Sequence, residues 1–118
     1  MTDETQGGKR ILVTGMSGLI GGMVGRSLAK KHYVRALNRQ DVEGVDCVRA
    51  DISDLDAIRP AFEDIEIVVH MAAYLGPEFS SQVSGNVIGA YNVFEAAREA
   101  GVKRVIFGSS GATQMQYE

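Results

Sequence analysis

Residues 10–21 read RILVTGMSGLIG, and this stretch decides the fold of the 118-residue chain. A short apolar run ends at Thr14, and glycines follow at three-residue intervals, at positions 15, 18 and 21. Residues 23–31 then have helical composition, with the apolar side chains of Met23, Val24, Leu28 and Ala29 on one side. A strand, a glycine turn and a helix in this order are typical of a loop that binds the pyrophosphate of a dinucleotide.

Each glycine of this turn has its own predicted task. Gly15 permits the tight turn, Gly18 lets the backbone approach the phosphates, and Gly21 lets the helix pack close to the strand. The phosphates would then meet unpaired N–H groups and the positive end of the helix dipole. We therefore expect the cofactor to contact this loop through Gly15, Ser17, Gly18, Leu19, Ile20 and Gly21.

The rest of the chain alternates between strand and helix patterns. Strands are predicted at 10–14, 32–37, 46–49, 65–70 and 105–108, and helices at 19–31, 54–62 and 78–100. Such alternation implies right-handed crossovers and a mostly parallel sheet. We predict a Rossmann-type, doubly wound α/β sheet of order 3-2-1-4-5 that stops after strand five, with the cofactor crevice between strands one and four.

Several details of the helices follow from single residues. Ser53 is predicted to cap the helix at 54–62, and Pro60 to shorten or bend it. In the long helix at 78–100, one apolar face is predicted, and Gly101 is predicted to end the helix. That face consists of Val83, Val87, Tyr91 and Phe94.

Composition narrows the classes of function. The net charge is −3 and there is no long basic run, so no footprint for nucleic acid is expected. The single cysteine, Cys47, is expected to be a buried small apolar residue in a reducing compartment. No run approaches the ~20 apolar residues of a membrane span, so we expect a cytoplasmic protein with no membrane partner. No metal site is predicted either. Residues 1–8 are expected to be a disordered tail, and residues 9–118 a single domain.

Cofactor choice is predicted at the end of strand two, about 20 residues past the glycine turn. An acidic residue there selects NAD, but this chain has Asn38 and Arg39. Asn38 can bond a ribose hydroxyl without repelling a phosphate, and Arg39 could pair with the 2′-phosphate of NADP, which favours NADP over NAD. The alternative for Arg39 is a solvated loop charge.

Two further strand ends face the predicted crevice. Asp51 either accepts from the adenine amino group, with Ile52 packed on the ring, or is a loop aspartate that helps to cap the next helix. After strand four, the small residues at 71–73 would let the backbone approach the ligand, so Met71, Ala72 and Ala73 are predicted cofactor contacts. His70 is expected to be a satisfied core histidine rather than a base.

These motifs together resemble the extended short-chain dehydrogenase/reductases, the NAD-dependent epimerases and dehydratases of nucleotide sugars and related carbohydrates. The resemblance covers residues 10–113 and rests on four segments: Thr14-Gly15-x-x-Gly18-x-x-Gly21, Asp51-Ile52, His70-Met71-Ala72-Ala73 and Asn86-Val87-x-Gly89-x-x-Asn92-Val93-x-Glu95-Ala96-Ala97.

The resemblance also implies catalytic roles. Ser110 would orient the substrate carbonyl or hydroxyl, and Ser109 would contact the cofactor. Asn86 would support the active-site lysine through water, or else is a polar residue of helix packing. The stretch after Ser110 also resembles the uronate dehydrogenases, but residues 111–115, GATQM, depart from the usual continuation and leave the substrate class open.

One part of the family's machinery is missing from the sequence. Its proton-transfer pair is a tyrosine with a lysine four residues later, whose ammonium lowers a phenol pKa that is near 10 when free. None of the four tyrosines has such a lysine, and the family carries the pair further along the chain. The chain is thus expected to be the inactive NAD(P)-binding portion of a sugar or nucleotide-sugar epimerase, dehydratase or dehydrogenase. The alternative is a non-catalytic dinucleotide-binding or redox-sensing module.

The same resemblance bears on assembly. In the family the helix at 78–100 and the one that follows it build a dimer interface, and Gly85 and Gly89 would allow close approach there. Strand five would also be an apolar sheet edge, open to pairing with another chain. We therefore expect self-association, most simply as a homodimer.

Overall fold

The computed structural model describes residues 8–72 and 83–108, with side chains from residue 86 onward in the second range. It contains a five-stranded sheet of order β3-β2-β1-β4-β5, in which all neighbouring strands pair in parallel. This confirms the predicted α/β class and strand order. The strands are β1 (Arg10–Thr14), β2 (Tyr33–Asn38), β3 (Asp46–Arg49), β4 (Ile67–His70) and β5 (Arg104–Phe107).

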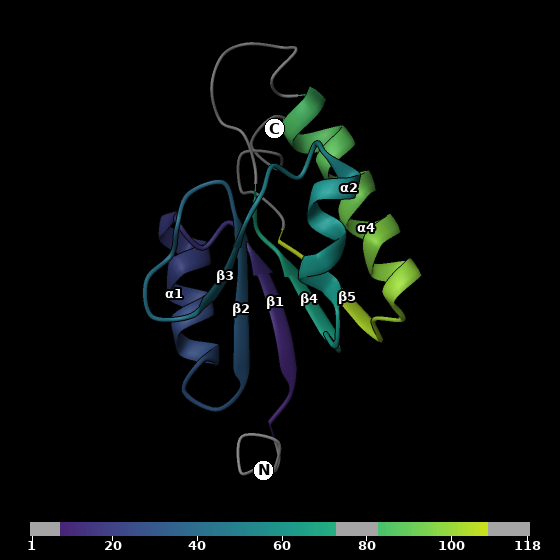
Figure 1. Cartoon of the computed structure of the whole chain (residues 1–118). Helices are drawn as coiled ribbons and strands as arrows, with labels where there is room; N and C mark the ends of the chain where they lie inside the picture. The colour runs from purple at the N-terminus through teal and green to yellow at the C-terminus, as the bar shows by residue number, and fades with distance from the viewer. Residues whose placement is uncertain (1–7, 73–82, 109–118) are drawn as a thin grey trace, which may run out of the picture.

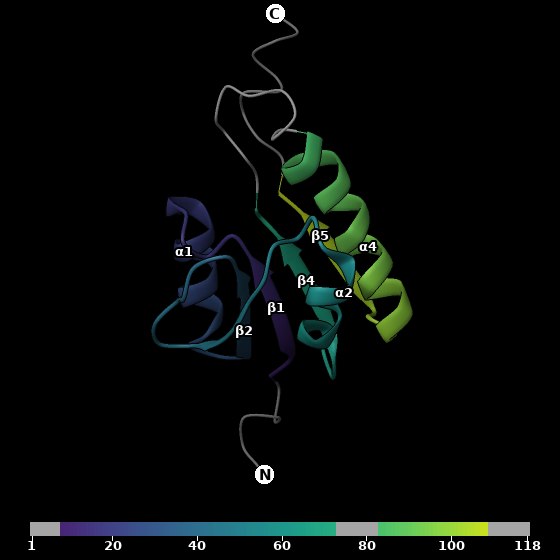
Figure 2. The same cartoon turned by 45° about the horizontal axis from the view of Figure 1, so that its top comes forward.

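Helices cover both faces of the sheet, as a doubly wound fold requires. Helix α1 lies on one face, and α2 and α4 lie together on the other (Figure 1). The same division is visible in the turned view of Figure 2. The helical segments are α1 (Leu19–Leu28), α2 (Leu55–Ile58), the 3₁₀ turn η2 (Arg59–Phe62), the π-helical segment η3 (Val83–Ile88) and α4 (Gly89–Ala100).

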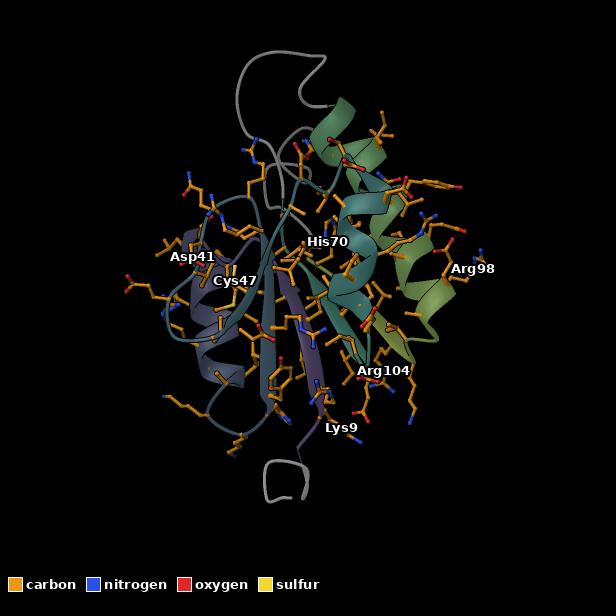
Figure 3. All side chains as sticks on the ribbon, in the orientation of Figure 1. Lys9, Asp41, Cys47, His70, Arg98 and Arg104 are labelled. Atoms are coloured by element: carbon orange, nitrogen blue, oxygen red, sulfur yellow. The ribbon has the colours of Figure 1, made fainter. Side chains whose placement is uncertain are left out.

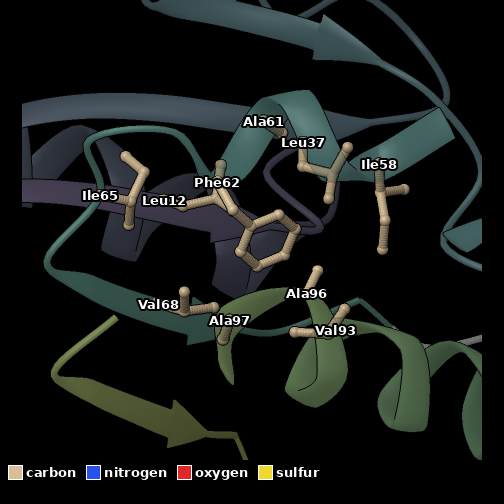
Figure 4. Close-up of a cluster of buried hydrophobic side chains, with 10 residues drawn as sticks. All are labelled: Leu12, Leu37, Ile58, Ala61, Phe62, Ile65, Val68, Val93, Ala96 and Ala97. Carbon is tan, nitrogen blue, oxygen red and sulfur yellow. The ribbon is translucent and has the colours of Figure 1, made fainter. Parts of the chain in front are cut away.

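The core has two layers that share β1. Leu12 belongs to the layer beneath α2 and α4, whereas Ile11 and Val13 belong to the layer beneath α1. Successive side chains of a strand point to opposite faces, which produces this division. Phe62 is fully buried at the centre of the first layer (Figure 4). Burying a side chain of this kind contributes about 1.5–3 kcal/mol.

Several boundaries differ from the prediction by one to three residues. Helix α1 ends at Leu28, because the amides of Lys30 and Lys31 bond only three residues back, to the carbonyls of Ser27 and Leu28. Strand β4 begins at Ile67 rather than at residue 65, since the amide of Ile65 bonds to the Phe62 carbonyl instead of joining the sheet. Strand β2 begins and ends one residue later than predicted, and β5 one residue earlier.

The predicted helix at 54–62 is divided, and its cap is a different residue. The α-helical part ends at Ile58 and a 3₁₀ turn follows, because Pro60 has no N–H for the next α-helical bond. The N-cap is Asp54, whose Oδ1 accepts from the amide of Ala57 at 3.3 Å. The prediction that Ser53 caps this helix was therefore wrong, because the Ser53 hydroxyl donates to Asp51 instead.

Helix α4 buries a different face from the one its large apolar residues suggest. Tyr91 and Phe94 of this helix are 64% and 46% exposed, and Val87 in the preceding η3 is 65% exposed. The buried face carries mainly small side chains, which let the helix approach the sheet closely: Asn92, Val93, Ala96 and Ala97. Gly101 ends the helix in the left-handed conformation, as predicted. Residues 78–82 of the predicted helix lie outside the described residues.

Within the described ranges, no helix is long and apolar enough to cross a membrane.

A candidate dinucleotide-binding site at the carboxyl edge of the sheet

The glycine turn between β1 and α1 lies at the carboxyl edge of the sheet. Gly15 has a φ of +80°, and a Cβ there would lie 2.7 Å from the amide nitrogen of Ala72. A Cβ at Gly21 would lie 2.1 Å from the carbonyl oxygen of Gly15. At Gly18 a Cβ would meet only the Gly15 oxygen, at an ordinary 3.5 Å. The fold itself therefore requires glycine at 15 and 21, but among the described residues nothing requires it at 18.

Helix α1 begins without a side-chain cap. Its N-cap is Gly18, in extended conformation, and the first turn contains no acidic residue. The first two residues of the helix, Leu19 and Ile20, are 78% and 57% exposed. Orphan amides and the positive end of the helix dipole at such a terminus favour an anionic ligand. The neighbouring Ser17 hydroxyl lies 3.5 Å from Asn38 Oδ1, to which it donates.

Beside this turn, Thr14 joins the ends of β1 and β4. Its Oγ1 accepts from the amides of Met71 and Ala72, at 2.9 and 3.0 Å, and lies 2.7 Å from His70 Nδ1. A hydroxyl has one proton, so with both amides donating to it Oγ1 donates to Nδ1. His70 is thus neutral and carries its proton on Nε2.

The surroundings of His70 agree with this protonation state. The residue is 2% exposed at the end of β4, an inner strand of the sheet (Figure 3), and its ring stacks on Phe107. Burial lowers the pKa of His70 to about 4. The expectation of a satisfied core histidine is confirmed.

The chain after β4 is held against the glycine turn. Two of its amides are bound by Thr14, and the Ala72 amide lies where a side chain at Gly15 would be. The Met71 side chain lies against Gly108, where a Cβ would be 2.4 Å from the sulfur. The structure therefore brings Gly15, Met71 and Ala72 together. Ala73, Ser109 and Ser110 lie outside the described residues.

The residues after β2 and β3 form the outer part of the same edge. Asn38 is buried, and its Nδ2 donates to the carbonyl of Gln40 at 3.0 Å. Asp51 Oδ1 accepts from the amide and the hydroxyl of Ser53, both at 2.9 Å. The Ser53 amide, with its hydroxyl and the charge of Arg39, holds the pKa of the Asp51 carboxyl below its usual value. Asp51 thus closes the turn before α2, and its contact with adenine stays a prediction.

A residue on α4 positions this outer loop. Asn92 is 6% exposed, and its Nδ2 donates to the carbonyl of Ile52 at 2.9 Å. The bond fixes the backbone of the residue predicted to pack on the adenine ring. Sequence reasoning missed this role, although Asn92 stands in one of the segments that carry the family resemblance.

A second residue missed from the sequence is Arg49. A pocket of about 390 Å³ at this edge is lined by Arg39, Arg49, Ala50 and Asp51. The register of the sheet, which pairs Arg49 with Asn38, brings Arg49 to this edge. A pocket of about 500 Å³ at the amino edge lies away from the side where open α/β sheets bind ligands.

The remaining candidate residues are placed as follows. Asn86 is half-buried in η3, just before α4. Cys47 is half-buried rather than buried, because β3 is an outer strand of the sheet, and burial raises the pKa of its thiol. In the part of the chain that the structure describes, no three His, Cys, Asp or Glu residues gather to hold a metal ion.

This edge, with its glycine turn, uncapped helix and neighbouring strand ends, defines a dinucleotide-binding α/β domain. Residues 11–115 match the model of the NAD dependent epimerase/dehydratase family, and the chain belongs to that family. It is the NAD(P)-binding portion of the family's fold.

Relatives and solved structures agree with this assignment. The chain is 39% identical to an L-arabinose 1-dehydrogenase (NAD(P)(+)) of Haloferax volcanii, over 92% of this chain and 43% of the relative. It is 33% identical to a uronate dehydrogenase of Agrobacterium fabrum, over 89% of this chain and 42% of the relative. A mutant uronate dehydrogenase from Agrobacterium tumefaciens, crystallised with NAD, superposes with a TM-score of 0.78 at 31% identity, over 86% of this chain and 41% of that one. The chain thus spans about two fifths of the length of these relatives.

Proposed function

We propose that the chain supplies the dinucleotide-binding part of an NAD(P)-dependent dehydrogenase that oxidises a sugar or a sugar acid. The observation that carries the proposal is Gly18. Its backbone is extended at the N-terminus of an uncapped helix, and the fold has room for a side chain there. A glycine that packing does not require, at the positive end of a helix, fits the approach of a phosphate to the backbone.

Each predicted contact residue is assigned to one part of the dinucleotide. The loop from Gly15 to Gly21 holds the pyrophosphate, with Ser17, Leu19 and Ile20 lining it. Asn38 and Arg39 would bind the adenosine ribose, Asp51 and Ile52 the adenine, and Met71 and Ala72 would line the crevice. Ala73 and Ser109, which lie outside the described residues, are proposed as further cofactor contacts. Bound nicotinamide would accept or return a hydride.

Substrate chemistry is proposed from the relatives. The names of the two cited relatives specify an arabinose and a uronate as substrates. Ser110 would orient the reacting hydroxyl or carbonyl, and Asn86 would support a lysine carried elsewhere in the full-length protein. A homodimer is proposed as the working assembly, since Val87, Tyr91 and Phe94 leave an apolar helix face exposed.

Cofactor preference is proposed to favour NADP, with NAD also accepted. The end of β2 has no carboxylate to repel a 2′-phosphate, and Arg39 is exposed beside it. The name of the L-arabinose 1-dehydrogenase includes both cofactors.

The test is a substitution that should change stability and binding in opposite directions. Aspartate is a favoured N-cap, so Gly18→Asp should leave the free energy of unfolding unchanged or raise it by up to ~1 kcal/mol. Its carboxylate would meet the pyrophosphate, and calorimetry should show at least about tenfold weaker binding of NAD and NADP. Gly18→Asn is the control, with similar size and capping but no charge, and should bind more tightly than Gly18→Asp. Unchanged affinity in Gly18→Asp would contradict the proposed site.

A further inference from the structure

Two arginines end neighbouring strands at the outer part of the carboxyl edge. Arg49 is the last residue of β3 and pairs in register with Asn38, and Arg39 directly follows Asn38. Both side chains are exposed, and both line the pocket of about 390 Å³ together with Ala50 and Asp51. The chain therefore places two arginines around one hollow.

Neither guanidinium has a hydrogen bond or an ion pair with another described residue. Elsewhere Arg35, Arg59 and Arg98 each bind a carboxylate. The carboxylate in the pocket, Asp51, already accepts two bonds from Ser53 through Oδ1. Two positive charges and one negative charge thus line the pocket. Like charges around one hollow favour an anion that can lie between them.

The position of the pocket restricts which anion it takes. It adjoins the end of β2, where a dinucleotide in this fold presents the hydroxyls of its adenosine ribose. Guanidinium groups bind phosphate oxygens in pairs, with geometry that an ammonium does not provide. A phosphate monoester on the 2′ position would therefore meet Arg39, which directly follows β2, and Arg49 of β3.

We propose that Arg49 is a specificity residue for NADP, and that it binds the 2′-phosphate jointly with Arg39. The inference rests on the proposed function, because it needs the dinucleotide to lie along this edge. It adds a residue from β3 to a recognition site that sequence reasoning placed on β2 alone.

The experiment measures binding of NAD, NADP, 2′-AMP and 5′-AMP to the full-length protein by calorimetry. Arg49→Gln should weaken NADP and 2′-AMP by about tenfold, the loss expected for a charge-assisted bond, and leave NAD within about twofold. Arg39→Gln should act in the same way. Arg104→Gln, an exposed arginine at the start of β5 on the opposite edge of the sheet, is the matched control and should change none of the four affinities.

The contrary outcomes separate the two proposals. If NAD binds to wild type but Arg49→Gln leaves NADP unchanged, the role of Arg49 is wrong and the proposed function stands. If Arg49→Gln weakens 5′-AMP as much as 2′-AMP, the pocket is a general phosphate site and the inference is also wrong. If neither dinucleotide binds to the folded wild-type protein, the proposed function itself fails.

Discussion

Replacing Thr14 by valine would remove one hydroxyl group and keep the shape of the side chain. That hydroxyl lies at the junction of β1 and β4, where it accepts from the amides of Met71 and Ala72 and donates to His70. Thr14 and His70 are 0% and 2% exposed, so water does not readily replace the lost bonds. The substitution therefore tests whether this hydroxyl holds the two strand ends together.

The magnitude can be worked from the three bonds. The Met71 amide keeps a partner, because it also lies 3.2 Å from the Thr14 carbonyl oxygen. The Ala72 amide and His70 Nδ1 lose the partner described for each. A buried polar group without a partner costs ~1–3 kcal/mol, so Thr14→Val should lower the free energy of unfolding by about 3 kcal/mol. That is a large part of the ~5–15 kcal/mol of a typical domain.

Urea unfolding followed by circular dichroism measures the loss, and Thr14→Ser is the matched control. Serine keeps the hydroxyl and lacks one methyl group, so its cost should be near ~1 kcal/mol. Dinucleotide binding should weaken in Thr14→Val, since the freed amide of Ala72 borders the glycine turn. A Thr14→Val protein within ~1 kcal/mol of wild type would refute the reasoning. So would a Thr14→Ser protein that loses as much as Thr14→Val.

Three other predictions concern acidity, packing and assembly. Burial lowers the pKa of His70 to about 4 from 6.5, so the unfolded state takes up a proton first as the pH falls. The free energy of unfolding should thus fall by up to about 3 kcal/mol between pH 6.5 and 4, and urea titrations of His70→Asn should show a smaller fall. In Gly21→Ala the new Cβ would lie 2.1 Å from the Gly15 oxygen. We expect a loss of roughly 2 kcal/mol or more in thermal or urea unfolding, and stability within ~0.5 kcal/mol of wild type would argue against the close approach. Ile106 is 48% exposed on β5, so Ile106→Lys should reduce self-association in light scattering; a wild-type protein that stays monomeric at high concentration would exclude this edge as an interface.

Much of the fold was predictable because its signals are local. Glycine is required at 15 and 21 because backbone atoms of the same molecule lie too close for a Cβ. The apolar run of β4 indicates a strand buried on both faces. Alternation of strands and helices then left few topologies. The order of the sheet follows from these facts without any knowledge of side-chain packing.

The errors arose where tertiary contacts decide between similar local options. Tyr91 and Phe94 predicted a buried apolar helix face, but both are exposed, and the smaller Ala96 and Ala97 are buried instead. Ser53 and Asp54 both have capping side chains, and the hydrogen bond of Ser53 to Asp51 left the cap to Asp54. Neither choice is visible in hydrophobic periodicity.

The site shows the same limit. Thr14 and His70 are 56 residues apart, so their bond follows only from the register of β1 against β4. Arg49 likewise reaches the outer part of the carboxyl edge through the register of β2 against β3. Sequence motifs predicted the loops at the carboxyl edge of the sheet, but not the partners that hold them.

The sharing of β1 by both core layers has a consequence for engineering. A shift of one residue would exchange Leu12 with Ile11 and Val13 between the layers, and would separate Thr14 from His70. Substitutions in β1 are therefore poorly tolerated, because its side chains pack into both core layers. The side chains of Arg39 and Arg49 are exposed and belong to neither layer, so redesign of coenzyme preference can start there with the least risk of misfolding.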